Sequence, residues 1–362
     1  MIIRNEIKKI EKDIIKWRRD FHKYPELSFE EHLTSKKIGE ELKKMGMNPK
    51  MKIGKTGVVS DLRFGEGPII ALRADMDALP LQEKGNLSFK SKHKGIMHAC
   101  GHDAHMAMLL GVAKTLSGYK KDLRGTVRFI FQPAEEGKGG ARYMIRDGCL
   151  DGVEEIYGLH VWNYQPAGEV GVKEGPVMAA ADMFYIKIKG VGGHGAAPQG
   201  TVDAIVVASH LIQSFQTVVS RNINPLDNAV ITVGKIKGGD NFNIIADEVY
   251  IEGTARSYTE VNRSLIKSKM NQIIEGVSNT YGAKINFEYV DGYPPTINSA
   301  NCAKKVLKAA KKVVGDKAGL PYLSMGGEDF SYYLQKRPGC FFFVGSAPDP
   351  TKLFGTPQHC SH

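Results

Sequence analysis

Three short apolar runs, each followed by side chains that can bind a metal ion or move a proton, constrain the fold of this chain most strongly. Run 68–72 precedes Asp75 and Asp77, run 127–131 precedes Glu135 and Glu136, and run 155–159 precedes His160. Short, continuously apolar runs are typical of strands that are buried on both faces. In open α/β sheets, ligand-binding and catalytic groups gather at the carboxyl ends of such strands. We therefore expect these polar side chains to meet at one edge of a sheet.

A fourth segment, residues 97–105, adds a thiol and imidazoles ahead of an apolar helix. Cys100, His102, Glu136 and His160 together offer sulfur, nitrogen and oxygen donors, a set that suits Zn²⁺ and is acceptable to Mn²⁺, Co²⁺ or Ni²⁺. Further candidate donors are Asp75, Asp77, His105 and His359. This surplus favours two divalent metal ions, about 3.5–4 Å apart, with a thiolate able to bridge them. The alternative interpretation is that the cysteine and the histidines are ordinary core side chains.

The neighbouring carboxylates Glu135 and Glu136 follow their strand through Pro133. Adjacent side chains at such a turn diverge, so one can bind metal while the other faces water. Hydrolysis needs this division, because one carboxylate must be free to take a proton from water and pass it to the leaving amine. The alternative is an acidic helix N-terminus, stabilised by the helix dipole.

Composition excludes several classes of protein. The chain has 362 residues, 42% hydrophobic and 24% charged, which suits a globular protein of two domains. It has no apolar run of about 18 residues and no signal-peptide core at its start, so we expect a cytoplasmic protein without a membrane partner. The net charge of +10 comes from dispersed lysines without interleaved aromatic residues, so we expect no nucleic-acid partner. Five widely spaced cysteines do not indicate a disulfide framework.

Strand and helix patterns alternate up to about residue 175, which predicts an α/β fold with a mixed, mainly parallel sheet covered by helices. From residue 183 to 290 the order becomes strand, helix, strand, strand, helix, strand, which predicts an inserted ferredoxin-like α+β domain. We expect residues 1–178 and 293–362 to form a catalytic metal-binding domain. Residues 179–292 are then an inserted lid or dimerisation domain.

Several motifs in order resemble the N-acyl-amino-acid amidohydrolase family of co-catalytic metallopeptidases, which has a zinc-exopeptidase-like fold. This family includes hippurate hydrolase, bacterial aminoacylases, N-acetyldiaminopimelate deacetylase and plant auxin-conjugate hydrolases. The resemblance runs over essentially the whole chain. The motifs that carry it are Arg18 to Ser28, Arg73 to Pro80, His98 to Asp103, Phe131 to Glu136, Gly158 to His160 and Gly327 to Phe330.

The resemblance implies roles for individual residues. Cys100 corresponds to a ligand that bridges two metal ions, Glu135 to the general base, and His194 to a lid histidine that reaches a neighbouring subunit's active site. The remaining metal ligands implied are His102, Glu136, His160 and His359, and the implied contacts to a substrate carboxylate or oxyanion are Asn243 and Arg256. The resemblance also implies a homodimer or homotetramer. Members of the family continue beyond the last ligand motif, whereas this chain ends at His362, so we expect the packing around His359 to differ.

We therefore predict a metal-dependent amidohydrolase that cleaves N-acyl amino acids, or related small conjugates, to a carboxylic acid and a free amino acid. Two alternatives remain. One is a dipeptidase or other small-peptide metallopeptidase that uses the same metals, and the other is a catalytically silent, metal-binding oligomeric protein. A nucleobase deaminase is disfavoured because no Pro-Cys-x-x-Cys motif follows the histidine motif.

Overall fold

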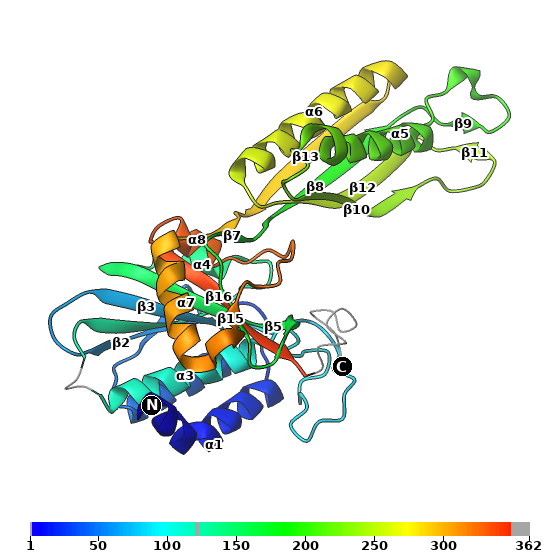
Figure 1. Cartoon of the computed structure of the whole chain (residues 1–362). Coiled ribbons are helices and arrows are strands. Elements are labelled where there is room, and N and C mark those ends of the chain that lie inside the picture. Colours follow the sequence, from blue (N-terminus) through cyan, green and yellow to red (C-terminus); the bar gives the residue numbers. More distant parts are fainter. Residues whose placement is uncertain (1, 120–122, 349–362) are drawn as a thin grey trace. The chain divides into compact units, whose positions relative to one another are not determined.

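The computed structural model of the protein describes residues 2–119 and 123–348, and these form two compact units (Figure 1). The described part of the larger unit comprises residues 2–119, 123–175, 297–322 and 329–348. The smaller unit comprises residues 176–296 and 323–328. No described helix is both long and apolar enough to cross a membrane.

An eight-stranded sheet forms the centre of the larger unit, in the order β1-β2-β4-β3-β5-β16-β6-β15. Its strands are β1 (Lys50–Ile53), β2 (Gly57–Arg63), β3 (Ile69–Asp75), β4 (Thr126–Gln132), β5 (Val153–Pro166), β6 (Val170–Gly171), β15 (Ala318–Gly319) and β16 (Gly339–Ala347). The central strands β4, β3, β5 and β16 pair in parallel, whereas β1, β2 and β4 pair in antiparallel fashion. The predicted mixed, mainly parallel α/β sheet is confirmed.

Helices cover this sheet. They are α1 (Ile2–Lys23), α2 (His32–Lys44), α3 (His102–Ser117), α4 (Gly140–Arg146), α7 (Ala300–Val314) and α8 (Ser331–Leu334). Trp17 of α1, Leu42 of α2 and Leu110 of α3 share one buried core with Phe129 of β4. This core fixes α3 against the strands, and α3 carries the predicted histidine ligand at its first residue.

The prediction that His160 follows the end of its strand is wrong, because β5 extends from Val153 to Pro166. The strand continues because its parallel pairing with β16 extends as far as Pro166. Asp75 and Gln132, in contrast, are the last residues of β3 and β4. The β3–β5 register pairs Arg73 with Gly158, so Asp75 and His160 lie at the same level of the sheet, two residues further on. His160 therefore still reaches the edge at which β3 ends.

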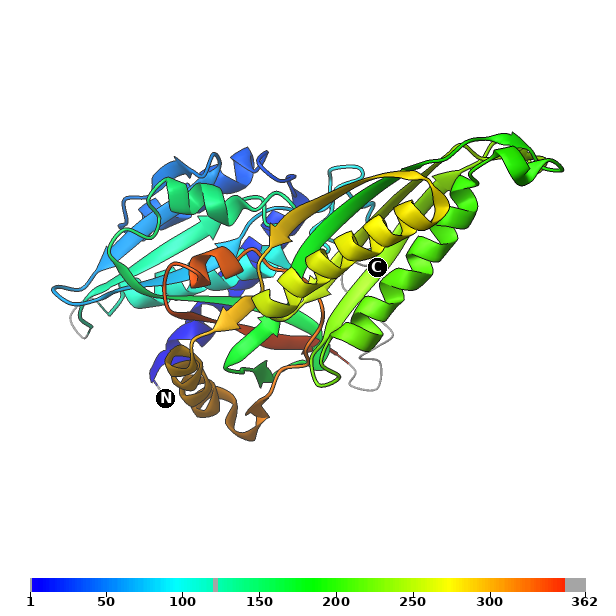
Figure 2. The ribbon, with the colours of Figure 1, turned by 90° about the horizontal axis from the view of Figure 1, so that it is seen from above.

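The smaller unit is a four-stranded antiparallel sheet with two helices (Figures 1 and 2). Its elements are β8 (Ala180–Lys189), α5 (Ala204–Thr217), β10 (Ala229–Gly238), β12 (Glu248–Ser257), α6 (Glu260–Tyr281) and β13 (Lys284–Tyr293). The strand order is β10-β12-β8-β13, and α5 and α6 lie side by side on one face, where Phe215 and Met270 pack against Ile186. Chain order and sheet order confirm the predicted ferredoxin-like domain.

A two-stranded antiparallel ribbon extends the smaller unit beyond this sheet. It consists of β9 (Gly193–His194) paired with β11 (Ile244–Ile245), with a short 3₁₀ turn at Pro198–Gly200. The remaining short elements of the chain are a π-helical turn at Val218–Asn222, a 3₁₀ turn at Gly315–Lys317, and strands β7 (Gly175–Met178) and β14 (Thr296–Asn298).

Candidate metal centre

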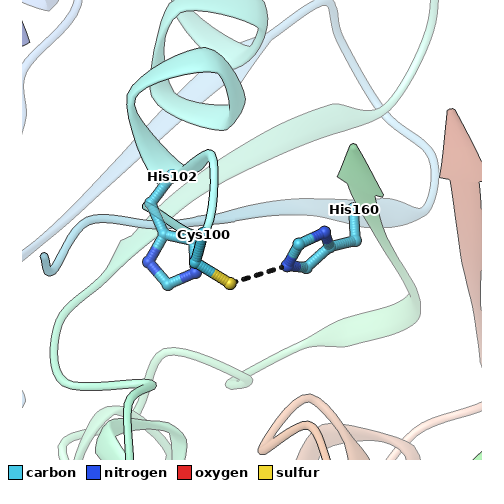
Figure 3. A group of neighbouring side chains, drawn as sticks. All are labelled: Cys100, His102 and His160. Atoms are coloured by element: carbon cyan, nitrogen blue, oxygen red, sulfur yellow. Dashed lines mark hydrogen bonds between the residues drawn. The ribbon is translucent and has the colours of Figure 1, made fainter. Parts of the chain in front are cut away.

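Cys100, His102 and His160 converge at the edge of the large sheet (Figure 3). Their ligand atoms lie within 4.8 Å of one another, and Cys100 Sγ is 3.3 Å from His160 Nε2. All three side chains are buried. Gly101 permits this arrangement, because its φ is 93° and an added Cβ would lie 2.3 Å from a Val161 methyl carbon. The loop can therefore bring the thiol and the first residue of α3 together only with glycine between them.

Both imidazoles are held in the orientation that metal binding requires. The Nδ1 of His102 donates to the backbone carbonyl of Asp77 at 2.8 Å, and the Nδ1 of His160 donates to the carbonyl of Val161 at 2.5 Å. Each hydrogen bond fixes the tautomer and leaves Nε2 as the donor to a metal. The Nε2 atom of His102 is buried and faces the thiol of Cys100, 3.8 Å from Asp75 Oδ2 and 4.0 Å from Glu136 Oε1. This buried nitrogen among sulfur and oxygen donors fits a metal ion.

Glu135 and Glu136 approach the same place from the turn after β4. Ligand atoms of both carboxylates lie within 4.8 Å of His102. The carboxylate of Asp77 holds this turn, since it accepts the backbone N–H of Glu135 at 2.9 Å and that of Glu136 at 3.0 Å. His102 belongs to three candidate groups, with Cys100 and His160, with Glu135 and Glu136, and with Asp75 and His105. Together these groups offer more donors than one ion needs, which favours two ions in one site.

Charge at this edge is poorly balanced. Burial and the carboxylate of Glu136 raise the pKa of Cys100 well above its usual value. The pKa of Glu136 is raised to about 7. Burial and the repulsion of Asp77 raise it, and the attraction of His102 lowers it by less. Burial alone would lower the pKa of His102. Asp75 and Cys100 together raise it by more than burial lowers it, so the net shift of the pKa is upward. A divalent cation would reverse the shifts of the thiol and the carboxylate, because both become ligands in their ionised forms.

Two of the surplus donors already have other partners. The carboxylate of Asp75 accepts from Arg73 Nη1 at 2.6 Å and from His105 Nδ1 at 2.6 Å. The other ring nitrogen of His105, Nε2, accepts the backbone N–H of Val161 at 2.9 Å. His105 therefore connects the end of β3 to the residue after His160. These contacts give both side chains a positioning role in place of the ligand role that the sequence left open.

The candidate residues of the smaller unit fall into two groups. His194 and Asn243 lie together on the β9–β11 ribbon, where both are exposed and Gly195 donates to the carbonyl of Asn243 at 2.8 Å. Arg256 lies near the other end of β12 and donates to Thr254 Oγ1 at 3.0 Å. At about 3.3 Å per residue, β12 separates Arg256 from the end that carries the β9–β11 ribbon by more than about 20 Å. The smaller unit does not bring all three residues to one place.

Sequence reasoning missed a buried ion-pair network beneath the site. Arg73 bonds Asp329 Oδ1 at 2.9 Å and Gln132 Oε1 at 2.8 Å, and Gln132 in turn donates to Asp329 at 2.8 Å. The only signal was that these residues fall within the recognised motifs, because an isolated arginine at a strand end does not indicate its partner. His359, the fifth predicted ligand, lies outside the described residues.

Comparisons with known proteins identify the family of this chain. The model of peptidase family M20/M25/M40 matches residues 71–357. An N-acetyl-L-cysteine deacetylase of Bacillus subtilis is 46% identical, with 94% of this chain and 82% of that protein covered. An IAA-amino acid hydrolase of Arabidopsis thaliana is also 46% identical, with 91% of this chain and 76% of that protein covered.

A solved structure supports the same family. The crystal structure of a dinuclear metal binding peptidase from the M20 family of Bacillus subtilis superposes with a TM-score of 0.83 at 36% identity, covering 98% of this chain and 97% of that one. The family match extends over most of the sequence, and both relatives align with most of their own length. The chain belongs to peptidase family M20/M25/M40.

Proposed function

We propose that this protein is a metal-dependent amidohydrolase that cleaves the amide bond of N-acyl amino acids, or of related small conjugates, to a carboxylic acid and a free amino acid. One observation carries the proposal. A thiol and two tautomer-fixed imidazoles converge on one point, and the buried Glu135 and the partly buried Glu136 reach the same point. The relatives named as a deacetylase and as an amino acid conjugate hydrolase support this substrate class.

Cys100, His102, Glu136 and His160 are the residues that would hold two divalent metal ions, with His359 as a fifth ligand. Zn²⁺ or Mn²⁺ suits these donors best, and Co²⁺ or Ni²⁺ is acceptable. When bound, such ions supply Lewis acidity at the scissile carbonyl and at the attacking water. The surplus of buried acidic groups at this edge supports cation binding.

Glu135 is the proposed general base. Its carboxylate is buried at 6% exposure, and its backbone is fixed by Asp77, so its direction is set before substrate arrives. It takes a proton from the attacking water and returns it to the amide nitrogen, which then leaves as an amine. Glu136 acts as a ligand, and the divergence of the two neighbouring side chains separates the two tasks.

A screen of the purified protein tests this function. We expect turnover of N-acetyl and N-benzoyl amino acids in the presence of added Mn²⁺ or Zn²⁺, and loss of turnover after chelation. Dipeptides are the matched control, because they present the same amide but carry a free α-amino group on the acyl side. Faster turnover of dipeptides would favour the small-peptide metallopeptidase. Absence of turnover on both classes, with metal bound, would favour the catalytically silent protein.

We also propose that residues 179–292 act as a lid and dimerisation domain on the catalytic segments 1–178 and 293–362. His194 and Asn243 would stabilise the oxyanion or contact the substrate carboxylate in a neighbouring subunit, and Arg256 would contact substrate from the opposite end of the lid. Their separation along β12 supports a site composed from two chains. A homodimer or homotetramer follows from this arrangement, and a cytoplasmic location stays a prediction from the sequence.

Subunit mixing tests the composite site. His194→Ala and Glu135→Gln should each be inactive alone. After subunit exchange, half of the dimers are mixed and one of their two sites is intact, so activity should return to about a quarter of the parent value. A protein that is monomeric by light scattering and fully active at the same concentration would contradict the two-chain site.

A further inference from the structure

Glu31 is a buried carboxylate that none of the roles above uses. It precedes α2, has no exposed surface, and accepts three hydrogen bonds. Its Oε1 accepts the N–H of Phe29 at 2.9 Å and the N–H of Ala134 at 2.9 Å, and its Oε2 accepts Thr56 Oγ1 at 2.5 Å. The contact to Ala134 joins two segments that are 103 positions apart in the sequence.

Ala134 has an unusual backbone conformation. Its φ is 55°, in the left-handed region, and its side chain is fully buried. For a residue with a Cβ this conformation costs about 1–2 kcal/mol, and it persists only where surrounding contacts determine it. Glu31 supplies one such contact through the N–H of Ala134, and Gly140 supplies another by donating to the carbonyl of Ala134 at 2.9 Å.

The residues after Ala134 are the two glutamates of the candidate metal centre. Their N–H groups bond to Asp77, so two carboxylates bind three consecutive backbone N–H groups of this turn. The conformation of Ala134 sets the direction in which the chain leaves β4. It therefore sets where the side chain of Glu135 points.

We propose that Glu31 is a positioning residue for the hydrolytic reaction, which holds Ala134 in the left-handed conformation and so aims the carboxylate of Glu135. This inference rests on the general-base role proposed for Glu135. Glu31 itself does not contact the reacting atoms. Its effect is expected in kcat, because a misdirected base slows proton transfer without weakening substrate binding.

The test compares three substitutions of Glu31. Glu31→Gln should keep kcat within about threefold, because the amide oxygen can accept both backbone N–H groups while its NH₂ donates to Thr56. Glu31→Leu should lower kcat at least about tenfold, with KM and metal content close to the parent values. If the leucine variant does not fold, Glu31→Asp replaces it in the comparison, because the aspartate side chain is one methylene shorter. It should also lower kcat.

A second substitution separates positioning from general structural damage. Ala134→Gly removes the cost of the left-handed conformation. Combined with Glu31→Leu or Glu31→Asp, it should restore kcat at least about threefold relative to the single variant. Glu26 provides a matched control in the same segment, since its carboxylate accepts the N–H groups of Leu33 and Thr34 at the start of α2. Glu26→Leu should affect stability and leave kcat unchanged.

Hydrogen exchange of the metal-free protein gives a readout that does not depend on activity. The peptide containing residues 134–136 should exchange faster in Glu31→Leu than in the parent, and Glu26→Leu should not accelerate it. If the parent cleaves no N-acyl amino acid, the proposed function fails, while the exchange comparison still tests the contact. Unchanged exchange, or a loss of kcat that follows metal content and is not restored by Ala134→Gly, would overturn the positioning role.

Discussion

The smaller unit and the candidate metal centre of the larger unit bury carboxylates in opposite ways. In the smaller unit, Asp182 accepts from Arg263 at 2.6 Å, from the Tyr289 hydroxyl at 2.8 Å and from the N–H of Gly292 at 2.9 Å. This carboxylate has a cationic partner and its hydrogen bonds are satisfied. At the candidate metal centre, the acidic side chains lie beside one another, and the pKa values of Cys100 and Glu136 are raised.

The difference distinguishes buried carboxylates that stabilise the fold from buried carboxylates that can bind a cation. A balanced buried pair loses stability when one partner is removed, because the other is left as an uncompensated charge. An unbalanced acidic cluster is relieved when a cation binds, or when one acid is neutralised. We therefore expect substitutions at the metal centre to change activity and metal content. Substitutions around Asp182 should change stability.

The largest effect is expected from Glu135→Gln. The substitution preserves size and keeps the backbone contact to Asp77, but it removes the group that carries the proton. Turnover should fall by about 10²–10⁴-fold, while metal per chain and the unfolding midpoint stay close to the parent values. Steady-state kinetics with elemental analysis measures this. A rate within a few-fold of the parent would contradict the role of general base.

Asp182→Ala should give the next largest effect. It leaves Arg263, whose side chain is 13% exposed, with only the exposed Glu260 as an acidic partner, and this should lower the stability of the smaller unit by about 3 kcal/mol. Denaturant unfolding of each unit measures the change in its free energy of unfolding. The control is Asp291→Ala, because the Asp291–Lys267 pair is exposed and should contribute at most about 1 kcal/mol. Equal losses in the two variants would mean that Asp182 is not a structural centre.

These two regions also differ in how far the sequence predicted them. The ferredoxin-like order of the smaller unit could be read from periodicity, and the ligand types at the sheet edge could be read from strand ends. The position of His160 could not, since the imidazole itself interrupts the apolar run and conceals that β5 continues to Pro166. Glu31 could not be predicted either. Its partner Ala134 is far away in sequence, and alanine gives no sign of a left-handed backbone.

The same limit applies to Asp75 and His105. Both are residue types that bind metals, and their sequence positions fit a metal centre. Only the three-dimensional contacts assign Asp75 to Arg73 and both nitrogens of His105 to protein partners. Residue type predicts which atoms can bind a metal. The choice among several such residues depends on competing hydrogen bonds between distant segments.

Cys100→Ser should change the free energy of unfolding less than Asp182→Ala does. It should lower the metal content directly. It replaces a thiolate donor with a weaker hydroxyl ligand, so metal per chain should fall to about half of the parent value or less. Elemental analysis after dialysis measures this. Cys149→Ser is the matched control, since Cys149 is buried in the same unit at 2% exposure and is not a predicted ligand. Equal metal content in both variants would place the metal elsewhere.

The smallest effect is expected from His22. It tests whether a charge-balanced cluster in the larger unit also contributes to stability, as the Asp182 cluster does in the smaller unit. His22 is buried in the larger unit, with Nδ1 2.9 Å from Asp103 and Nε2 3.4 Å from Glu83. Burial lowers the pKa of His22, but Asp103 and Glu83 raise it more, so the net pKa lies above its usual value of 6.5. Arg18 also donates to Asp103 at 3.3 Å, so two cationic groups face two carboxylates, and this balanced cluster lies close to the unbalanced one.

A raised histidine pKa fixes the sign of the pH dependence. The stabilisation is fully present below the unfolded-state pKa, about 6.5, and is lost as the pH rises through the folded-state value. Each unit of upward shift contributes about 1.4 kcal/mol. The free energy of unfolding of the parent, relative to His22→Gln, should therefore be larger at pH 6 than at pH 9. His93→Gln is the control, because Nδ1 of His93 contacts the carbonyl of Pro25 at 2.7 Å and no carboxylate. A difference between parent and His22→Gln that does not change with pH, or that grows toward pH 9, would show that His22 is not held as a cation by its two carboxylates.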